Sequence, residues 1–229
     1  MQIIEQTDLG VRSAVMTFER TGSAVRFVVV PMMHVAAPAF YREVTRRLRP
    51  CDVVVAEGVQ GGRVRVLTLA YRLAGRFRRS GLVQQSDALD LKKLDAEIVR
   101  PDLSAEEFAR GWSALRWWLR LGVLIAAPVL GLVMLVVGPL RVLGSNLALD
   151  DLRSPEEEDL GSEEFDQLVG GERDRRLVAE LIRQDDAHQA DPQPWFVGVP
   201  WGAEHVRAIA PALIRRGYQI RNAEWVTLI

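Results

Sequence analysis

VRFVVVPMMHVAAPAFYREVTRRLRPCDVVVAEG, residues 25–58, contains two apolar runs on either side of an amphipathic segment. The two valine-rich runs are typical of strands that are buried on both faces of a sheet. Between them, Phe40, Val44 and Leu48 fall on one helical stripe, and Pro50 follows as a stop signal. A strand, a helix and a second strand in this order predict two parallel strands joined by a right-handed crossover.

The remainder of the chain shows the same alternation of strands and helices. The pattern predicts two strands around a Thr-Gly turn at 11–31, a helix at 171–187, a third buried strand at 195–199, a helix at 203–216 and a closing strand at 218–228. This order predicts an α/β fold with a mostly parallel central sheet flanked by helices. We expect one domain over residues 1–229, with a strongly apolar helical excursion at about 105–150.

The composition indicates a folded chain with a sizeable core. The 229 residues are 48% apolar and 26% charged, and the net charge of −1 gives no reason to expect a nucleic-acid partner. Cys51 is the only cysteine, so a disulfide framework is excluded. The first ten residues lack the basic and apolar regions of a cleavable signal peptide.

One polar side chain follows each of the three expected core strands: His34 the first, Glu57 the second and His205 the third. Ligands of an open parallel sheet bind beyond the carboxyl ends of its strands. The three side chains are therefore candidates for one site that ligates a divalent metal or shares acid-base duties. Either histidine alone is also typical of a plain loop residue, whereas Glu57, a charge directly after a buried strand, needs a partner. The third histidine, His188, lies in a polar linker and is given no role.

Three segments carry short motifs in a particular order. They are VVVPMMHV with the following helix and CDVVVAEG, then GERDRRLVAELI, then GAEHVRAIAPALIRRGYQI, and they lie within residues 11–60 and 170–220. Together they resemble the TraB/PrgY/TIKI family, which has wider kinship with erythromycin-esterase-like and ChaN-like proteins. The family pattern has two GxxH motifs, a glutamate after the second strand and a Glu-Arg-Asp helix. The first motif departs from it, because Pro31 stands in place of glycine.

The resemblance implies a metal-dependent hydrolase, and some members of the family are described as peptidases. It carries catalytic roles over to His34, Glu57, Arg173 and His205, and metal ligation to His34, Glu57 and His205. The metal would be a divalent ion such as Mn²⁺ or Co²⁺ rather than a structural zinc, because the sequence has no dedicated zinc signature. The substrate would be a peptide or a small molecule such as an ester.

Two side chains keep alternative roles open. Arg173 would stabilise a developing oxyanion, a role that suits a fixed guanidinium, or would form a surface ion pair with Glu172 or Asp174. Glu204 either complements the dipole of the helix that follows it or adds a second carboxylate to the site.

The excursion contains an apolar run, residues 121–140, that has no charge and follows Trp117 and Trp118. Its length fits a membrane-spanning helix, and tryptophans are typical of the membrane interface. A single crossing, however, would place His34 and His205 on opposite sides of the membrane. Two arrangements avoid this separation. One is a helical hairpin that rises over 105–127, turns at 128–131 and returns over 132–149, and the other is a buried core or dimer-interface helix.

Two classes of function therefore remain from the sequence. The first is a metal-dependent hydrolase, and the second is a non-catalytic, membrane-associated regulatory or binding protein that retains the scaffold. The expected partners are a membrane, contacted through residues 117–141, and a second copy of the chain, bound through the apolar segment. We expect a membrane-associated protein with a cytoplasmic α/β domain, and a soluble cytoplasmic protein is the alternative.

Overall fold

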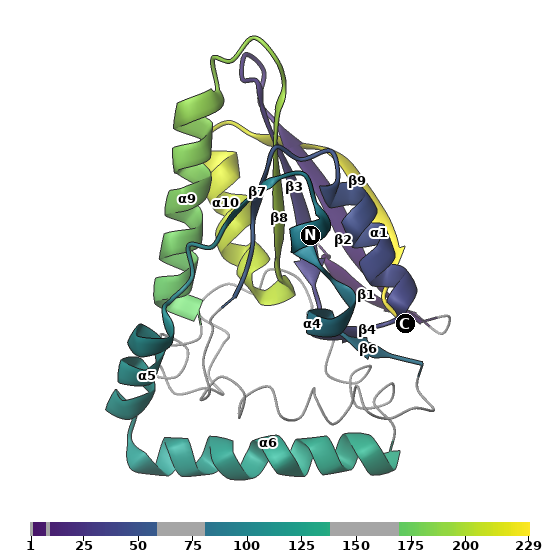
Figure 1. Ribbon diagram of the computed structural model, residues 1–229, viewed down its shortest axis with the longest axis vertical. Helices are drawn as coiled ribbons and strands as arrows, with labels where there is room; N and C mark the ends of the chain where they lie inside the picture. The colour runs from purple at the N-terminus through teal and green to yellow at the C-terminus, as the bar shows by residue number, and fades with distance from the viewer. Residues whose placement is uncertain (1, 8–9, 59–80, 138–169) are drawn as a thin grey trace.

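The structure is a computed structural model that describes residues 2–7, 10–58, 81–137 and 170–229. A mixed seven-stranded sheet forms its centre (Figure 1). The strands are β1 (Ile4–Thr7), β2 (Gly10–Glu19), β3 (Val25–Met32), β5 (Val53–Val55), β7 (Glu97–Val99), β8 (Trp195–Gly202) and β9 (Gln219–Thr227). Strands β3, β8, β5 and β7 lie side by side in this order and are parallel. The predicted α/β fold with a mostly parallel sheet is therefore confirmed.

The antiparallel part of the sheet is built around β2. Strand β9 pairs with β2 along nearly its whole length, while β1 and β3 pair with the first and last parts of β2. The β2–β3 connection contains the expected Thr-Gly turn, in which Gly22 has a φ of +83°. Glycine adopts this left-handed conformation without steric cost. The predicted hairpin and closing strand are thus present.

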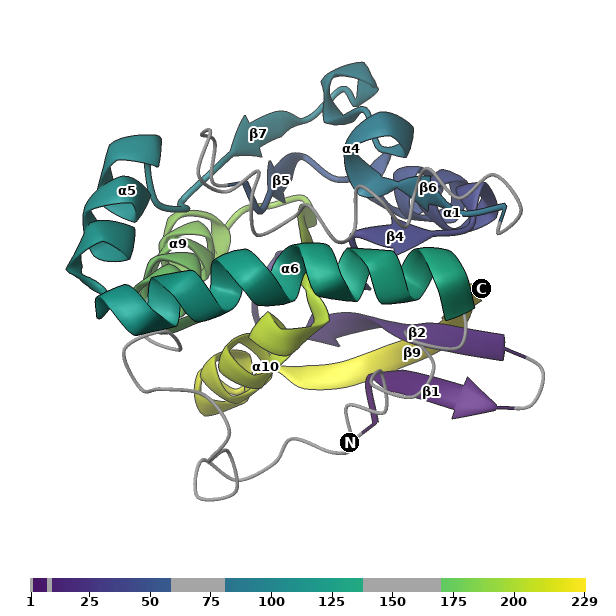
Figure 2. The same cartoon turned by 90° about the horizontal axis from the view of Figure 1, so that it is seen from below.

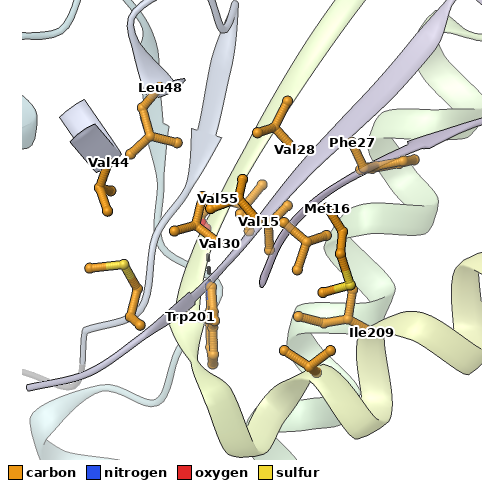
Figure 3. Packing of buried hydrophobic residues seen from close by; sticks show 14 of the residues in the cluster. Val15, Met16, Phe27, Val28, Val30, Val44, Leu48, Val55, Trp201 and Ile209 are labelled. Carbon is orange, nitrogen blue, oxygen red and sulfur yellow. Dashed lines mark hydrogen bonds between the residues drawn. The ribbon is translucent and has the colours of Figure 1, made fainter. Parts of the chain in front are cut away.

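Helices cover both faces of the sheet. Helix α1 (Pro38–Leu48) packs on one face, and α9 (Glu172–His188) and α10 (Val206–Arg215) lie on the opposite face (Figure 1). Figure 3 shows Val44 and Leu48 of α1 on one side of the central strands, and Phe27 with Ile209 of α10 on the other. All four side chains are buried. The valine-rich strands are apolar on both faces because both faces are covered.

The close approach of α1 to the sheet depends on Gly198 in β8. A Cβ atom at this position would lie 2.6 Å from Cδ2 of Leu48 and 3.1 Å from Sγ of Cys51. Leu48 is fully buried and has little room to move. We expect Gly198→Ala to lower the free energy of unfolding by about 1–3 kcal/mol, the usual cost of overpacking a core. Urea denaturation followed by circular dichroism measures this change.

Gly122 provides the matched control for this substitution. It lies in a helix, and an added Cβ would meet no atom within 4 Å. Gly122→Ala should leave the free energy of unfolding unchanged or raise it slightly. Equal stability of the two alanine variants would contradict the packing argument for Gly198.

The structure changes the interpretation of the apolar excursion. Helix α5 (Ala105–Ala114) begins at the predicted position, and the Ser104 side chain caps it together with Glu107. Helix α6 (Trp117–Val137) then runs through Pro128 without interruption. The predicted turn at 128–131 is therefore wrong, and so is the hairpin built on it. Proline removes one backbone donor from a helix, and here that loss does not end it.

Helix α6 lies at the periphery of the molecule. It crosses in front of the other elements when the molecule is seen from below (Figure 2), and it lies beyond the carboxyl ends of the parallel strands (Figure 1). Its described side chains are exposed or half-buried, which contradicts a buried core helix. In the part of the chain that the structure describes, no helix is long and apolar enough to span a membrane, so the expected transmembrane helix is not found there.

Several short elements were not predicted. They are β1, β7, the 3-10 helix η2 (Leu91–Lys93), the helix α4 (Gln85–Ala88), and a small sheet of β4 (Val35–Ala36) and β6 (Val83–Gln84). Strand β7 has the sequence EIV within a polar segment and is partly exposed, which explains why apolar patterning does not reveal it. The segments 59–80 and 138–169 lie outside the described residues.

Candidate functional site

The carboxyl ends of β3, β5 and β8 meet at one edge of the sheet, as the sequence predicts. Glu57 follows β5 by two residues, and its Oε2 accepts a hydrogen bond of 2.8 Å from the backbone N–H of Gly202 at the end of β8. His205 ends the 3-10 helix η5 (Ala203–His205), which follows β8 directly. Nε2 of His205 lies 3.8 Å from Oε1 of Glu57. Two of the predicted site residues are therefore neighbours.

Arg173 joins the same site from α9 and is buried. Its Nη2 donates a hydrogen bond of 2.7 Å to Oε1 of Glu57. Its Nε and Nη2 also donate to the two carboxylate oxygens of Asp102, at 2.8 Å and 2.9 Å. The guanidinium thus holds two carboxylates, and its face lies over the ring of Trp201 at 5.6 Å. The alternative of a surface ion pair with Glu172 or Asp174 is wrong, because the Arg173 side chain is buried.

Asp102 is a site residue that the sequence interpretation missed. The sequence suggests only that Asp102 or Ser104 caps the helix that begins near Ala105. In the structure Ser104 is the cap, and the buried Asp102 carboxylate accepts hydrogen bonds from the backbone N–H groups of Gly58 and Leu103 as well as from Arg173. Both carboxylate oxygens are therefore fully engaged, and Asp102 anchors the guanidinium.

His205 is held in a defined orientation by Asp174. Its Nδ1 lies 2.5 Å from Oδ1 of Asp174, one residue after Arg173 on α9. The imidazole is almost completely buried, with the Trp201 ring in an edge-on contact at 5.0 Å. Its Nε2 is buried and has no hydrogen-bond partner. If Nδ1 carries the proton that Asp174 accepts, Nε2 presents a lone pair toward the site.

Asp174 is the second site residue that was missed. The sequence interpretation considered it only as a partner of Arg173. Helix geometry explains why Arg173 and Asp174 both reach the site: the first turn of α9 lies against the strand ends, and neighbouring side chains leave a helix about 100° apart. One therefore points to Glu57 and the other to His205. The Glu-Arg-Asp motif is the signal in the sequence that points to both.

His34 lies at the same edge but is exposed. Its backbone carbonyl accepts a hydrogen bond from the N–H of Gln85, which ties the chain after β3 to the small sheet. The structure therefore places His34 on the solvent side of the site rather than in its buried part.

The charges of this site favour an ionised Glu57. Burial opposes ionisation, but the charge of Arg173 and its hydrogen bond to Glu57 outweigh it, so the pKa of Glu57 lies below its ordinary value. Burial also opposes the ionisation of Asp102. Hydrogen bonds from Arg173 and from two backbone N–H groups outweigh it, so the pKa of Asp102 is lowered as well. The pKa of Arg173 is raised by its two carboxylate partners despite burial. Glu57 is therefore a carboxylate at neutral pH.

A fourth carboxylate, Glu204, borders the site. Its Oε1 lies 3.5 Å from Nε2 of His205, and its side chain is about half exposed. Among residues 2–7, 10–58, 81–137 and 170–229, no group of three or more His, Cys, Asp or Glu side chains has an arrangement that holds a metal ion. The donor chemistry nevertheless suits one, because a buried imidazole lone pair lies close to a carboxylate, and both are ligands of first-row divalent ions.

Comparisons with known proteins give no match to this chain among protein-family models, curated proteins or solved structures.

Proposed function

We propose that this chain is a metal-dependent hydrolase of the TraB type, with its reaction centre at Glu57 and His205. One observation carries the proposal. The buried Nε2 of His205 has no hydrogen-bond partner, although Asp174 fixes the other ring nitrogen. An unpaired buried polar atom costs free energy, so it persists where a function requires it. A lone pair directed toward Glu57 is available to bind a metal ion or to accept a proton.

A divalent ion would be held by His205 through Nε2 and by Glu57, since the exposed His34, the third ligand implied by the resemblance, forms no three-ligand group with them. A ligating histidine usually donates its other ring N–H to a carboxylate, as His205 does to Asp174. The carboxylate of Glu57 has lone pairs left after its two hydrogen bonds, to Arg173 and Gly202. When bound, such an ion lowers the pKa of its water and polarises the bond that is cleaved.

The chain's own residues then have distinct tasks. Arg173 and the Gly202 N–H keep Glu57 ionised and in place. Arg173 is a positioning residue, because its guanidinium donates hydrogen bonds to Glu57 and Asp102. In this proposal it therefore does not take the oxyanion-stabilising role that the sequence suggested. Glu204, exposed and close to His205, is placed to take a proton from the attacking water.

Substitution of His205 tests the metal-binding part of this proposal. Titration calorimetry with Mn²⁺ should show binding to the wild-type protein, and His205→Gln should weaken that binding by about tenfold or more, because the lone pair is lost. His188→Gln is the matched control. His188 also pairs through Nδ1 with a carboxylate, Asp191 at 2.8 Å, but it lies on the surface away from the site.

The control variant should bind Mn²⁺ as the wild-type protein does. Hydrolysis of p-nitrophenyl esters and of an unstructured peptide, with and without Mn²⁺, completes the experiment. If the wild-type protein binds no metal more tightly than His205→Gln and cleaves neither substrate class, the hydrolase proposal fails. The non-catalytic binding protein would then be the better interpretation.

A further inference from the structure

Helix α6 carries an apolar stripe that the rest of the described chain leaves uncovered. Its members are exposed and recur at helical spacing: Trp117, Trp118, Leu121, Leu124, Ile125 and Val129. Trp117 is 69% exposed and Ile125 is 55% exposed. With about 100° per residue, these six positions fall within one side of the helix. Contiguous exposed apolar surface of this kind marks an interaction site.

The opposite side of α6 faces the protein. Val123 packs against a small separate core formed by Leu103, Phe108, Trp112 and Leu115. Three of these residues belong to α5 or the segment before it, and Leu115 joins α5 to α6. This contact fixes the rotation of the helix. The apolar stripe therefore points away from the protein.

Along the sequence, the charges that flank the stripe are all basic. Residues 108–149 contain arginines but no aspartate or glutamate. Arg116 and Arg120 lie at the tryptophan end of the stripe, and the Arg116 guanidinium lies 5.9 Å from the centre of the Trp118 ring. Tryptophan and arginine side by side are typical of the headgroup region of a membrane, where anionic lipids attract the basic groups.

We propose that α6 lies flat on an anionic lipid surface, with its apolar stripe in the interfacial region. Exposed apolar side chains that include two tryptophans, in a helix whose only charged residue is Arg120, are suited to the interfacial region of an anionic membrane. A second copy of the chain fits less well. If the same segment of two copies met, Arg116 and Arg120 would face arginines and no acidic residue. This proposal is independent of the hydrolase proposal. Helix α6 lies beyond the same end of the sheet as the candidate site, where the parallel strands finish (Figure 1).

Vesicle flotation with the full-length protein tests this inference. We expect binding to vesicles of phosphatidylcholine with roughly a third phosphatidylglycerol, and clearly weaker binding to phosphatidylcholine alone. Ile125→Asp should reduce binding to the mixed vesicles by about tenfold or more, because it places a charge in the apolar stripe. Ile214→Asp is the matched control, since Ile214 is 56% exposed, lies on the helix α10 and is not part of the stripe.

The control variant should bind vesicles as the wild-type protein does, and circular dichroism should show that both variants are folded. Equal binding of Ile125→Asp and Ile214→Asp would overturn the proposal. The proposal would also be overturned if the wild-type protein bound neither vesicle type and formed a dimer in sedimentation velocity experiments, and if Ile125→Asp abolished that dimer. In that case a second copy covers the stripe.

Discussion

Arg173→Met is expected to lower the free energy of unfolding by about 3–5 kcal/mol, the usual cost of removing one partner from a buried ion pair. The methionine has a similar length but leaves Glu57 and Asp102 without their cation. Both carboxylates are at least partly buried, and both have pKa values that Arg173 helps to lower. Two uncompensated charges in the interior are the reason for the large effect. Urea denaturation at neutral pH, followed by circular dichroism, measures it.

Arg175→Met is the matched control on the same helix. The Arg175 side chain is 78% exposed and forms an ion pair with the nearby, partly exposed Glu172. Exposed pairs of this kind contribute little, so the control should stay within about 0.5 kcal/mol of the wild-type protein. If the two methionine variants are equally stable, Arg173 does not compensate buried charges in the way that the structure indicates.

The core of this fold could be predicted because its signals are local. Two valine-rich runs separated by an amphipathic helix define buried parallel strands and coincide with β3 and β5, and a third apolar run coincides with β8. The sequence does not reveal that β8, the last of the three in the chain, inserts between β3 and β5. This order depends on packing between segments far apart in the sequence. The predicted convergence of Glu57 and His205 needs only that the strands are parallel neighbours.

The partners of the site residues could not be predicted, since they come from elements with weak local signals. Asp102 follows the partly exposed strand β7 and looks like a helix cap in the sequence, because aspartate is a good capping residue. Asp174 lies in a helix with many charges, where charge patterning does not distinguish an inward carboxylate from a solvated one and only the Glu-Arg-Asp motif points to it. Only the position of the first turn of α9 against the strand ends separates these possibilities.

The hairpin prediction failed for an instructive reason. The prediction placed a turn at 128–131, yet α6 continues through Pro128. The cost of proline inside a helix depends on what would replace the helix. The residues around Pro128 and Gly131 are apolar and do not favour a turn. A continuous helix keeps its other backbone hydrogen bonds.

Glu57→Gln is expected to slow hydrolysis by about 10²–10⁴-fold, the range usual for loss of a group that takes part directly in proton transfer or ligation. The amide keeps the shape of the side chain and an oxygen that accepts the Gly202 N–H. It loses the negative charge that faces Nε2 of His205. Initial rates on the p-nitrophenyl ester or peptide of the proposed reaction, measured at saturating Mn²⁺, report the change.

Asp102→Asn separates this chemical effect from a loss of stability. Both substitutions remove one of the two carboxylates that bind Arg173, so both should destabilise the fold through the same guanidinium. The contacts of Asp102, however, are with Arg173 and two backbone N–H groups, whereas Glu57 also faces His205. We therefore expect Asp102→Asn to reduce the rate by less than about tenfold while it lowers the denaturation midpoint as Glu57→Gln does. If both variants lose activity equally, Glu57 acts through the stability of the charge cluster, and the reaction centre must be sought elsewhere.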